Sequence, residues 1–229
     1  MIIEVLGCTS SGKSTVIKKI IAGAADINTP IAASYPGGIS VLSLLFGDFL
    51  KLIYVIIFSK NRLSFLHFLR TCLNRTDSLW MRINLFRNFI KKQGEVYIAR
   101  RHRHVDIVLM DEGCLHAFSN IFCHYDDYPD TEYASKLMEF IPKPDVILRV
   151  MVSEDVMVER ANQRLDPPWP NLEDIQWRRI FRHTNILYQT ILASLDDIPV
   201  IVIDSSDTNI TNVIEQLNSI YLRENLNGS

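Results

Sequence analysis

Residues 2–14, which read IIEVLGCTSSGKS, determine how the rest of the chain is interpreted. The stretch from Gly7 to Ser14 matches the pattern G-x-x-x-x-G-K-[ST] at every fixed position. Ile2 to Leu6 is a short, largely apolar run that predicts a strand, and Ser14 to Ala22 predicts a helix. A strand, a glycine-bounded loop and a helix in this order are the context that the motif requires.

The loop has the chemistry of a phosphate-binding site. Gly7 and Gly12 allow backbone angles and a close approach that a side chain would prevent. The loop amides, with a helix N-terminus behind them, then bind phosphate oxygens. Lys13 is expected to reach the β- and γ-phosphates of ATP, and Ser14 to ligate Mg²⁺ through its hydroxyl. The expected nucleotide-binding residues are Gly7, Cys8, Thr9, Ser10, Ser11, Gly12, Lys13, Ser14 and Thr15.

Short apolar runs alternate with helical patterns along the chain. Strands are predicted at Ile2–Leu6, Pro30–Ser34, Val105–Met110, Asp145–Val152 and Pro199–Ile203. Further helices are predicted at roughly 79–92, 114–124, 154–164, 175–195 and 209–222. Strands that are apolar at consecutive positions are typical of a parallel sheet covered by helices on both faces. The pattern therefore predicts one α/β domain over 1–229, with three layers and a five-stranded parallel sheet.

The third predicted strand ends in two adjacent acids, Asp111 and Glu112. A carboxylate at the carboxyl end of a strand beside a phosphate loop is where such proteins hold Mg²⁺, directly or through water. We expect Asp111 to be this metal ligand, together with Ser14. Glu112 could activate a hydroxyl or position a water. The alternative is a pair of solvated acids at the end of a strand.

Arginines follow the fourth predicted strand. Arg160 and Arg164 are four residues apart and share one helix face, and Pro167-Pro168 then breaks the helix. Planar, always-charged donors above a phosphate site stabilise oxygen charge that develops during transfer, so we expect a lid over 160–182. The alternative for Arg160 and Arg164 is a surface position with ion pairs. Both interpretations stay open for Arg178, Arg179 and Arg182. The acids available for such pairs are Glu159, Asp166, Glu173 and Asp174.

Five segments follow one another in the order of a known pattern. They are the phosphate loop, Tyr35-Pro36-Gly37-Gly38, Asp111-Glu112-Gly113, Glu159–Arg164 and the final strand VIVID. With them the chain resembles, from end to end, the thymidylate kinase and deoxynucleoside kinase group of P-loop kinases. The resemblance implies a P-loop fold with an arginine-bearing lid and transfer of the γ-phosphoryl group of ATP. Lys13, Asp111, Glu112, Arg160 and Arg164 would carry that reaction.

Two positions depart from the pattern of that group. Tyr35 stands where thymidylate kinases have the acid of E-P-G-G, and deoxynucleoside kinases also use an acid near that position as base. The D-R pair that usually ends the third strand is Asp111-Glu112 here. The departures leave phosphoryl transfer intact and leave the acceptor open. A nucleoside or nucleotide-like acceptor is expected, and a sugar or glycan is the alternative.

The resemblance also implies a place for the acceptor, beyond the carboxyl edge of the sheet and facing the γ-phosphate. Tyr35, Arg87 and His116 are the candidate acceptor-binding residues, within or next to a helical insertion over 39–104. For His116, a surface position without a role is the alternative.

The 39–104 segment also permits a different function. In the apolar segment from Ile39 to Phe58, Asp48 and Lys51 are the only charged residues. The segment is long enough to span a membrane. Charges in the middle of a span are costly, however, so a buried or partly interfacial pair of helices is favoured. Residues 60–104 are rich in lysine and arginine and contain two acids, which predicts an anion-facing surface. A P-loop NTPase or switch docked on a membrane or anionic polymer is therefore the alternative to a kinase. The apolar part could also form a homodimer interface.

The composition narrows the setting. The chain has 229 residues, of which 48% are hydrophobic and 22% are charged, and its net charge is −2, so disorder is not expected. Cys8, Cys72, Cys114 and Cys123 lack metal-ligand spacing and the density of a disulfide scaffold. The N-terminus shows no secretory signal pattern. We expect a cytoplasmic, reducing setting.

Overall fold

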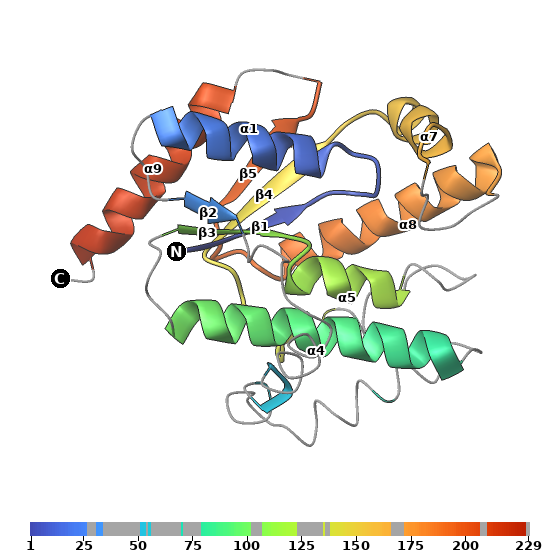
Figure 1. Cartoon of the computed structure of the whole chain (residues 1–229), viewed down its shortest axis with the longest axis horizontal. Helices are drawn as coiled ribbons and strands as arrows, with labels where there is room; N and C mark the ends of the chain where they lie inside the picture. Colours follow the sequence, from blue (N-terminus) through green and yellow to red (C-terminus); the bar gives the residue numbers. More distant parts are fainter. Residues whose placement is uncertain are drawn as a thin grey trace.

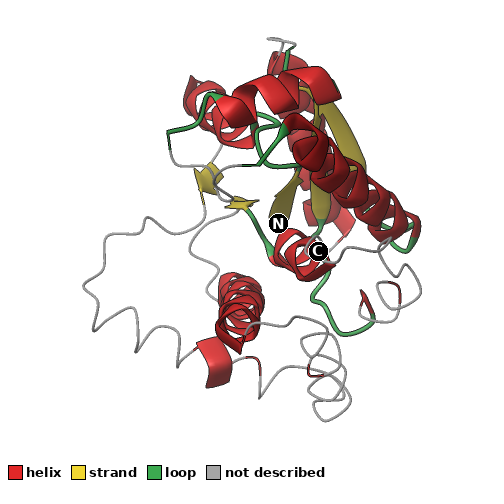
Figure 2. Cartoon of the chain, turned by 90° about the vertical axis from the view of Figure 1, so that its right-hand side faces the viewer, coloured by secondary structure: helices red, strands yellow, loops and turns green. Residues whose placement is uncertain are grey.

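The computed structural model describes residues 1–26, 31–33, 51–53, 55, 70, 79–101, 107–122, 135, 138–165, 172–206 and 210–227. The elements are β1 (Ile2–Leu6), α1 (Lys13–Asp26), β2 (Ile31–Ala33), α4 (Leu79–Arg101), β3 (Ile107–Asp111), α5 (Cys114–Phe122), β4 (Val146–Met151), α7 (Glu154–Asn162), α8 (Asp174–Ala193), β5 (Val200–Asp204) and α9 (Ile210–Asn227). Figure 1 labels them along the chain, and Figure 2 shows the same helices and strands from the side.

The strands form a parallel sheet in the order β2-β3-β1-β4-β5. β1 lies in the middle, between β3 and β4, and Val5 pairs with Asp111 at the carboxyl end of β3. The loop after β1 and the acids after β3 therefore leave the same edge of the sheet side by side. The predicted α/β fold with a parallel sheet is confirmed.

Helices cover the sheet on both faces (Figure 1). Successive side chains of a strand point to opposite faces. On β1, Ile3 and Val5 pack in the core formed with α1 and α9. Ile2 and Leu6 belong to the second core, which includes buried side chains of α4, α5 and α8. Glu4 faces this second core, and it is almost fully buried there.

The edge strand β5 departs from the predicted burial. All five residues of β1 are buried, whereas along β5 exposed and buried residues alternate. Ile201 and Ile203 enter the core, while Val200 and Val202 are exposed. A run of apolar residues thus indicated a strand correctly, but burial on both faces is wrong for this edge.

The ends of α4 and α7 differ from the expected bounds. α4 continues to Arg101, since Gln93, Gly94 and Val96 are buried and extend its packed face. α7 ends at Asn162, so Arg164 lies beyond the helix.

Among the described residues, no helix is long and apolar enough to cross a membrane. The apolar segment 39–58 lies outside the described residues except at 51–53 and 55.

Candidate active site

The loop between β1 and α1 needs both of its glycines. A Cβ at Gly7 would lie 2.6 Å from Ser11 Oγ and 2.9 Å from the Val150 carbonyl oxygen. Gly12 has a φ of +93°, which favours glycine, and a Cβ there would lie 3.2 Å from Arg160 Nη1. The backbone can therefore take its path only without side chains at these two positions, as the motif predicts.

Lys13 is held inside this loop. Its ammonium group donates hydrogen bonds to the carbonyl oxygens of Gly7, at 2.8 Å, and Cys8, at 3.1 Å. Burial lowers the pKa of Lys13 below its ordinary value, while the carboxylates of Glu112 and Asp111 act in the opposite direction. A cation is thus fixed at the place where the motif puts the phosphates of a nucleotide.

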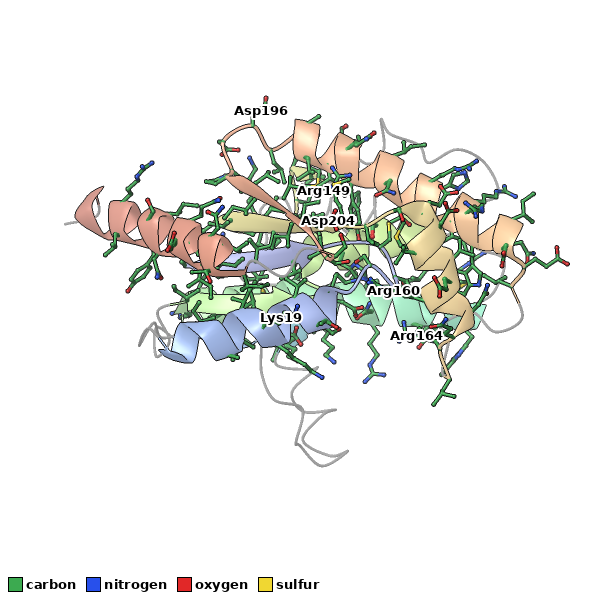
Figure 3. The ribbon with its side chains drawn as sticks, turned by 90° about the horizontal axis from the view of Figure 1, so that it is seen from above. Lys19, Arg149, Arg160, Arg164, Asp196 and Asp204 are labelled. Atoms are coloured by element: carbon green, nitrogen blue, oxygen red, sulfur yellow. The ribbon has the colours of Figure 1, made fainter. Side chains whose placement is uncertain are left out.

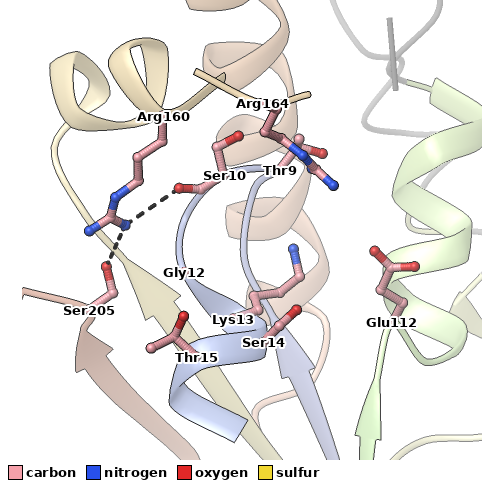
Figure 4. Close-up of a pocket in the computed structure, with 10 residues that line it drawn as sticks. All are labelled: Thr9, Ser10, Gly12, Lys13, Ser14, Thr15, Glu112, Arg160, Arg164 and Ser205. Carbon is pink, nitrogen blue, oxygen red and sulfur yellow. Dashed lines mark hydrogen bonds between the residues drawn. The ribbon is translucent and has the colours of Figure 1, made fainter. Parts of the chain in front are cut away.

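A cavity of about 400 Å³ opens at the loop (Figure 4). It collects residues from the loop and α1, from the turn after β3, from α7 and its end, and from the turn after β5. They are Thr9, Ser10, Gly12, Lys13, Ser14, Thr15, Glu112, Arg160, Arg164 and Ser205. Cys8 and Ser11, which the motif also includes, are buried and do not line the cavity. The cavity therefore joins the three motifs that were expected to act together.

Ser14 and Asp111 have the donor set of a magnesium site. The Ser14 hydroxyl donates a hydrogen bond to Asp111 Oδ2 at 3.3 Å. Oδ1 of the same carboxylate is buried and has no hydrogen-bond partner among the described residues. Mg²⁺ prefers oxygen ligands and usually takes only one or two protein carboxylates, together with phosphate oxygens and water. The two residues fit this ion.

Glu112 lines the cavity on the side opposite Arg160 and Ser205 (Figure 4). Its φ of +58° places it in the left-handed region, which is uncommon for a residue with a side chain. The turn separates the two neighbouring acids, because Asp111 contacts Ser14 while the half-exposed Glu112 carboxylate lines the cavity. Their surroundings suit different tasks.

Arg160 and Arg164 approach the loop from α7 and the residues after it (Figure 3). Arg160 Nη1 donates hydrogen bonds to Ser205 Oγ at 3.2 Å and to the Ser10 carbonyl oxygen at 3.5 Å. Arg164 is exposed and lines the same cavity. Although α7 is shorter than predicted, both arginines line the cavity at the phosphate loop. Their role in a lid stays a prediction.

The arginines of α8 have other partners. Arg178 contacts Glu154 at 3.0 Å and Asp155 at 2.6 Å, and Arg182 contacts Glu154 at 3.0 Å. Arg178, Arg179 and Arg182 do not line the cavity among its described residues. Arg178 and Arg182 instead join α8 to the first turn of α7. Arg178 and Arg182 therefore form ion pairs, as the alternative expected. Their partners are Glu154 and Asp155 and not the acids that were expected from the sequence.

The candidate acceptor residues have separate outcomes. His116 is buried, so a surface position for it is wrong. Its ring lies between Tyr188, with 2.9 Å from Nδ1 to the hydroxyl, and Glu112, with 3.5 Å from Nε2 to Oε1. Arg87 is an exposed residue of α4 and is not among the described residues that line the cavity. Tyr35 lies outside the described residues.

Three residues that sequence reasoning missed lie at or next to the site. Ser205 follows β5 and receives the Arg160 hydrogen bond. Tyr188 comes from α8 and contacts His116. Glu4 accepts a hydrogen bond from the His116 amide at 3.0 Å, and burial raises its pKa to about 7. An acid within an apolar strand was the available signal for Glu4; nothing comparable marked Tyr188.

Comparison with known proteins finds similar folds among solved structures. The sequence matches no family model and no curated protein. The fold is similar to deoxyadenosine kinase from M. mycoides with bound dATP, at a TM-score of 0.52 and 14% identity, over 95% of this chain and 100% of that one. For the same enzyme with the products dCMP and a flexible dCDP bound, the TM-score is 0.57 and the identity is 16%, over 96% of this chain and 100% of that one. The resemblance to deoxynucleoside kinases is confirmed as a likeness of fold.

Proposed function

We propose that this protein is an ATP-dependent phosphotransferase that transfers the γ-phosphoryl group to a nucleoside or nucleotide-like acceptor. The observation that carries the proposal is a cavity at the phosphate loop that Lys13, Glu112 and two arginines line together. Binding of a nucleotide alone needs the loop and a metal ligand. Transfer to an acceptor also needs arginines that stabilise charge on the phosphoryl group and an acid that faces the acceptor.

The cations would stabilise charge on the transferred group. Lys13, Arg160 and Arg164 all line the cavity, and we assign the two arginines to a lid over the phosphates. Ser14 and Asp111 would hold Mg²⁺, which neutralises phosphate charge when it is bound. Positioning and charge stabilisation account for most of the catalysis in reactions of this class.

Glu112 would act as the general base. Its carboxylate lines the cavity and can face an acceptor hydroxyl, whereas Asp111 is directed to Ser14. This assignment replaces the acid that the related kinases have near position 35, where this chain has tyrosine. A base in this role contributes roughly 10²–10⁴-fold to the rate.

A nucleoside-like acceptor is supported by the likeness of fold to deoxyadenosine kinase. We place its pocket beyond the carboxyl edge of the sheet, with the 39–104 segment as the acceptor-binding insertion. Ligands of doubly wound sheets bind outside this edge.

The test is a screen of ATP turnover and phosphorylated products with deoxynucleosides, nucleotides, sugars and sugar-like alcohols. The proposal expects a phosphorylated nucleoside or nucleotide and little ATP consumption without an acceptor. A phosphorylated sugar would keep the kinase and change the substrate class. ATP hydrolysis that no acceptor stimulates would favour the NTPase alternative. The Lys13→Ala variant serves as the control for contaminating activity.

A further inference from the structure

A line of polar side chains connects Glu112 to the interior of the protein. Glu112 Oε1 lies 3.5 Å from His116 Nε2, and His116 Nδ1 lies 2.9 Å from the Tyr188 hydroxyl. Tyr188 is 1% exposed and His116 is 6% exposed, whereas Glu112 is at the surface of the cavity. The three residues come from α8, α5 and the turn after β3, so the fold brings them together.

The proton positions follow from what each group can do. A carboxylate only accepts hydrogen bonds, so the ring nitrogen that faces Glu112 must carry a proton for the contact to be attractive. Burial, followed by the positive charges of Lys13 and Lys92, lowers the pKa of His116 well below its ordinary value, and the ring is neutral. A neutral imidazole with a proton on Nε2 leaves Nδ1 as an acceptor. The Tyr188 hydroxyl then donates to Nδ1.

Two other groups lie near the Tyr188 hydroxyl. The Gly7 carbonyl oxygen is a second acceptor for its proton, at 3.3 Å, which is a longer contact than the 2.9 Å to His116 Nδ1. Ser119 donates to the His116 carbonyl oxygen at 2.8 Å and lies 3.4 Å from the Tyr188 oxygen. The single proton of Tyr188 is therefore directed to the nearest acceptor, which is His116 Nδ1.

We propose that His116, oriented by Tyr188, is a positioning residue that holds the Glu112 carboxylate toward the cavity. The inference rests on the proposed function, in which Glu112 is the base. An exposed glutamate can take several rotamers, and a donor fixed in the core restricts it to those near Nε2. A catalytic group that moves by about 1 Å can lose roughly 10²-fold in rate. His116 and Tyr188 act through Glu112 and not on the acceptor.

The kinetic test is a double-mutant cycle with ATP and the acceptor found in the screen. Tyr188→Phe removes one oxygen, and His116→Gln keeps a donor but not the imidazole ring. Each is expected to lower kcat roughly 10–100-fold while the KM for ATP changes less than about twofold. In a Glu112→Gln background the same changes should alter kcat less than about twofold, because the group they position is gone. Equal losses in both backgrounds would overturn the inference.

Matched controls separate positioning from damage to the core. Tyr97→Phe removes the hydroxyl of a half-buried tyrosine on α4, and His183→Gln replaces a buried histidine on α8. Neither residue lines the cavity among its described members, and both variants should keep the wild-type kcat. A loss in these controls equal to that of Tyr188→Phe and His116→Gln would assign the effect to packing and would contradict the inference.

A second measurement does not depend on activity. In ¹⁵N NMR of the intact protein, with the His116 signals assigned from the His116→Gln spectrum, we expect the Nε2–H tautomer. Tyr188→Phe should shift the Nδ1 signal, and Glu112→Gln should shift the Nε2 signal. An Nδ1–H tautomer would overturn the inference whatever the enzyme does. A wild-type protein that phosphorylates no acceptor, but shows the expected tautomer, would instead contradict the proposed function.

Discussion

Ser14 and Asp111 are 97 residues apart in the sequence, yet the hydroxyl of Ser14 donates a hydrogen bond to the carboxylate of Asp111 at 3.3 Å. The contact follows from the sheet, since β1 and β3 are neighbours and Val5 is in register with Asp111. The strand that ends in the phosphate loop thus lies beside the strand that ends in the acid. This pairing brings the two residues of the proposed Mg²⁺ site together at the mouth of the loop.

The first prediction concerns these two ligands. Asp111→Asn should weaken binding of Mg·ATP by roughly tenfold or more, as expected for loss of a charged partner worth about 1.5 kcal/mol. ATP without Mg²⁺ should bind the variant and the wild type almost equally. Isothermal titration with and without Mg²⁺ measures both affinities.

Glu112→Gln is the matched control, because it neutralises the adjacent acid. It should keep the Mg·ATP affinity and lower turnover by roughly 10²–10⁴-fold. If the two variants behave alike in both measurements, the division of roles between these acids is wrong.

The second prediction concerns Lys13. Lys13→Ala should leave the protein folded and lower kcat by roughly 10²–10³-fold, the size of effect seen when a preorganised charge-stabilising group is removed. Burial disfavours the charged lysine, so we expect no loss of folding stability. Thermal unfolding and steady-state kinetics on the same preparation test the two parts. Wild-type turnover by the folded variant would remove the basis for the phosphate-loop assignment.

The third prediction is a pH dependence that arises from Glu4. Its pKa is raised from 4.5 to about 7 by burial, so the folded protein keeps the proton that the unfolded chain loses. The free energy of unfolding should therefore fall as the pH rises from about 4.5 to 7 and be constant above. At 1.36 kcal/mol for each pH unit, the contribution of this group is about 3 kcal/mol. Lys92 and the backbone amides at the start of α5 already oppose the shift.

Urea denaturation at several pH values can isolate this contribution. Glu4→Gln should reduce the decrease in stability between pH 4.5 and 7, because the variant has no proton to lose at this position. Glu215→Gln, which changes an exposed acid of α9, is the control and should preserve the wild-type dependence. An unchanged slope in Glu4→Gln would mean that another group causes it.

Local signals predicted the parts of the site that depend on neighbouring residues. Glycine, lysine and serine at fixed spacing defined the loop, and an acid after a β-branched run defined Asp111. Contacts that depend on register were not predictable. Ser205 meets Arg160 because β5 lies beyond β4 in the sheet, and Tyr188 meets His116 because α8 packs against α5. The burial of His116 was not predictable either, because it depends on the packing of α8 against α5 and not on the residues next to His116 in the sequence.

The last prediction compares arginines that differ in their surroundings. Arg160 and Arg164 line the cavity, whereas Arg178 contacts Glu154 and Asp155 on α7. Arg160→Ala and Arg164→Ala should each lower kcat at least roughly tenfold, with smaller effects on ATP affinity, because contacts made mainly in the transition state act on turnover. Lysine at either position should restore little, since it lacks the forked donor geometry.

Arg178→Ala is the control, because it makes the same substitution at a position that does not line the cavity among its described residues. The ion pairs of Arg178 are exposed to solvent, and exposed pairs contribute little to stability, so the variant should retain turnover and lose little stability. Steady-state kinetics on all three alanine variants decides between the roles. Equal turnover in all three would make Arg160 and Arg164 structural residues, with Arg160 holding Ser205 and the loop, and would strengthen the NTPase alternative, in which no acceptor phosphorylation requires them.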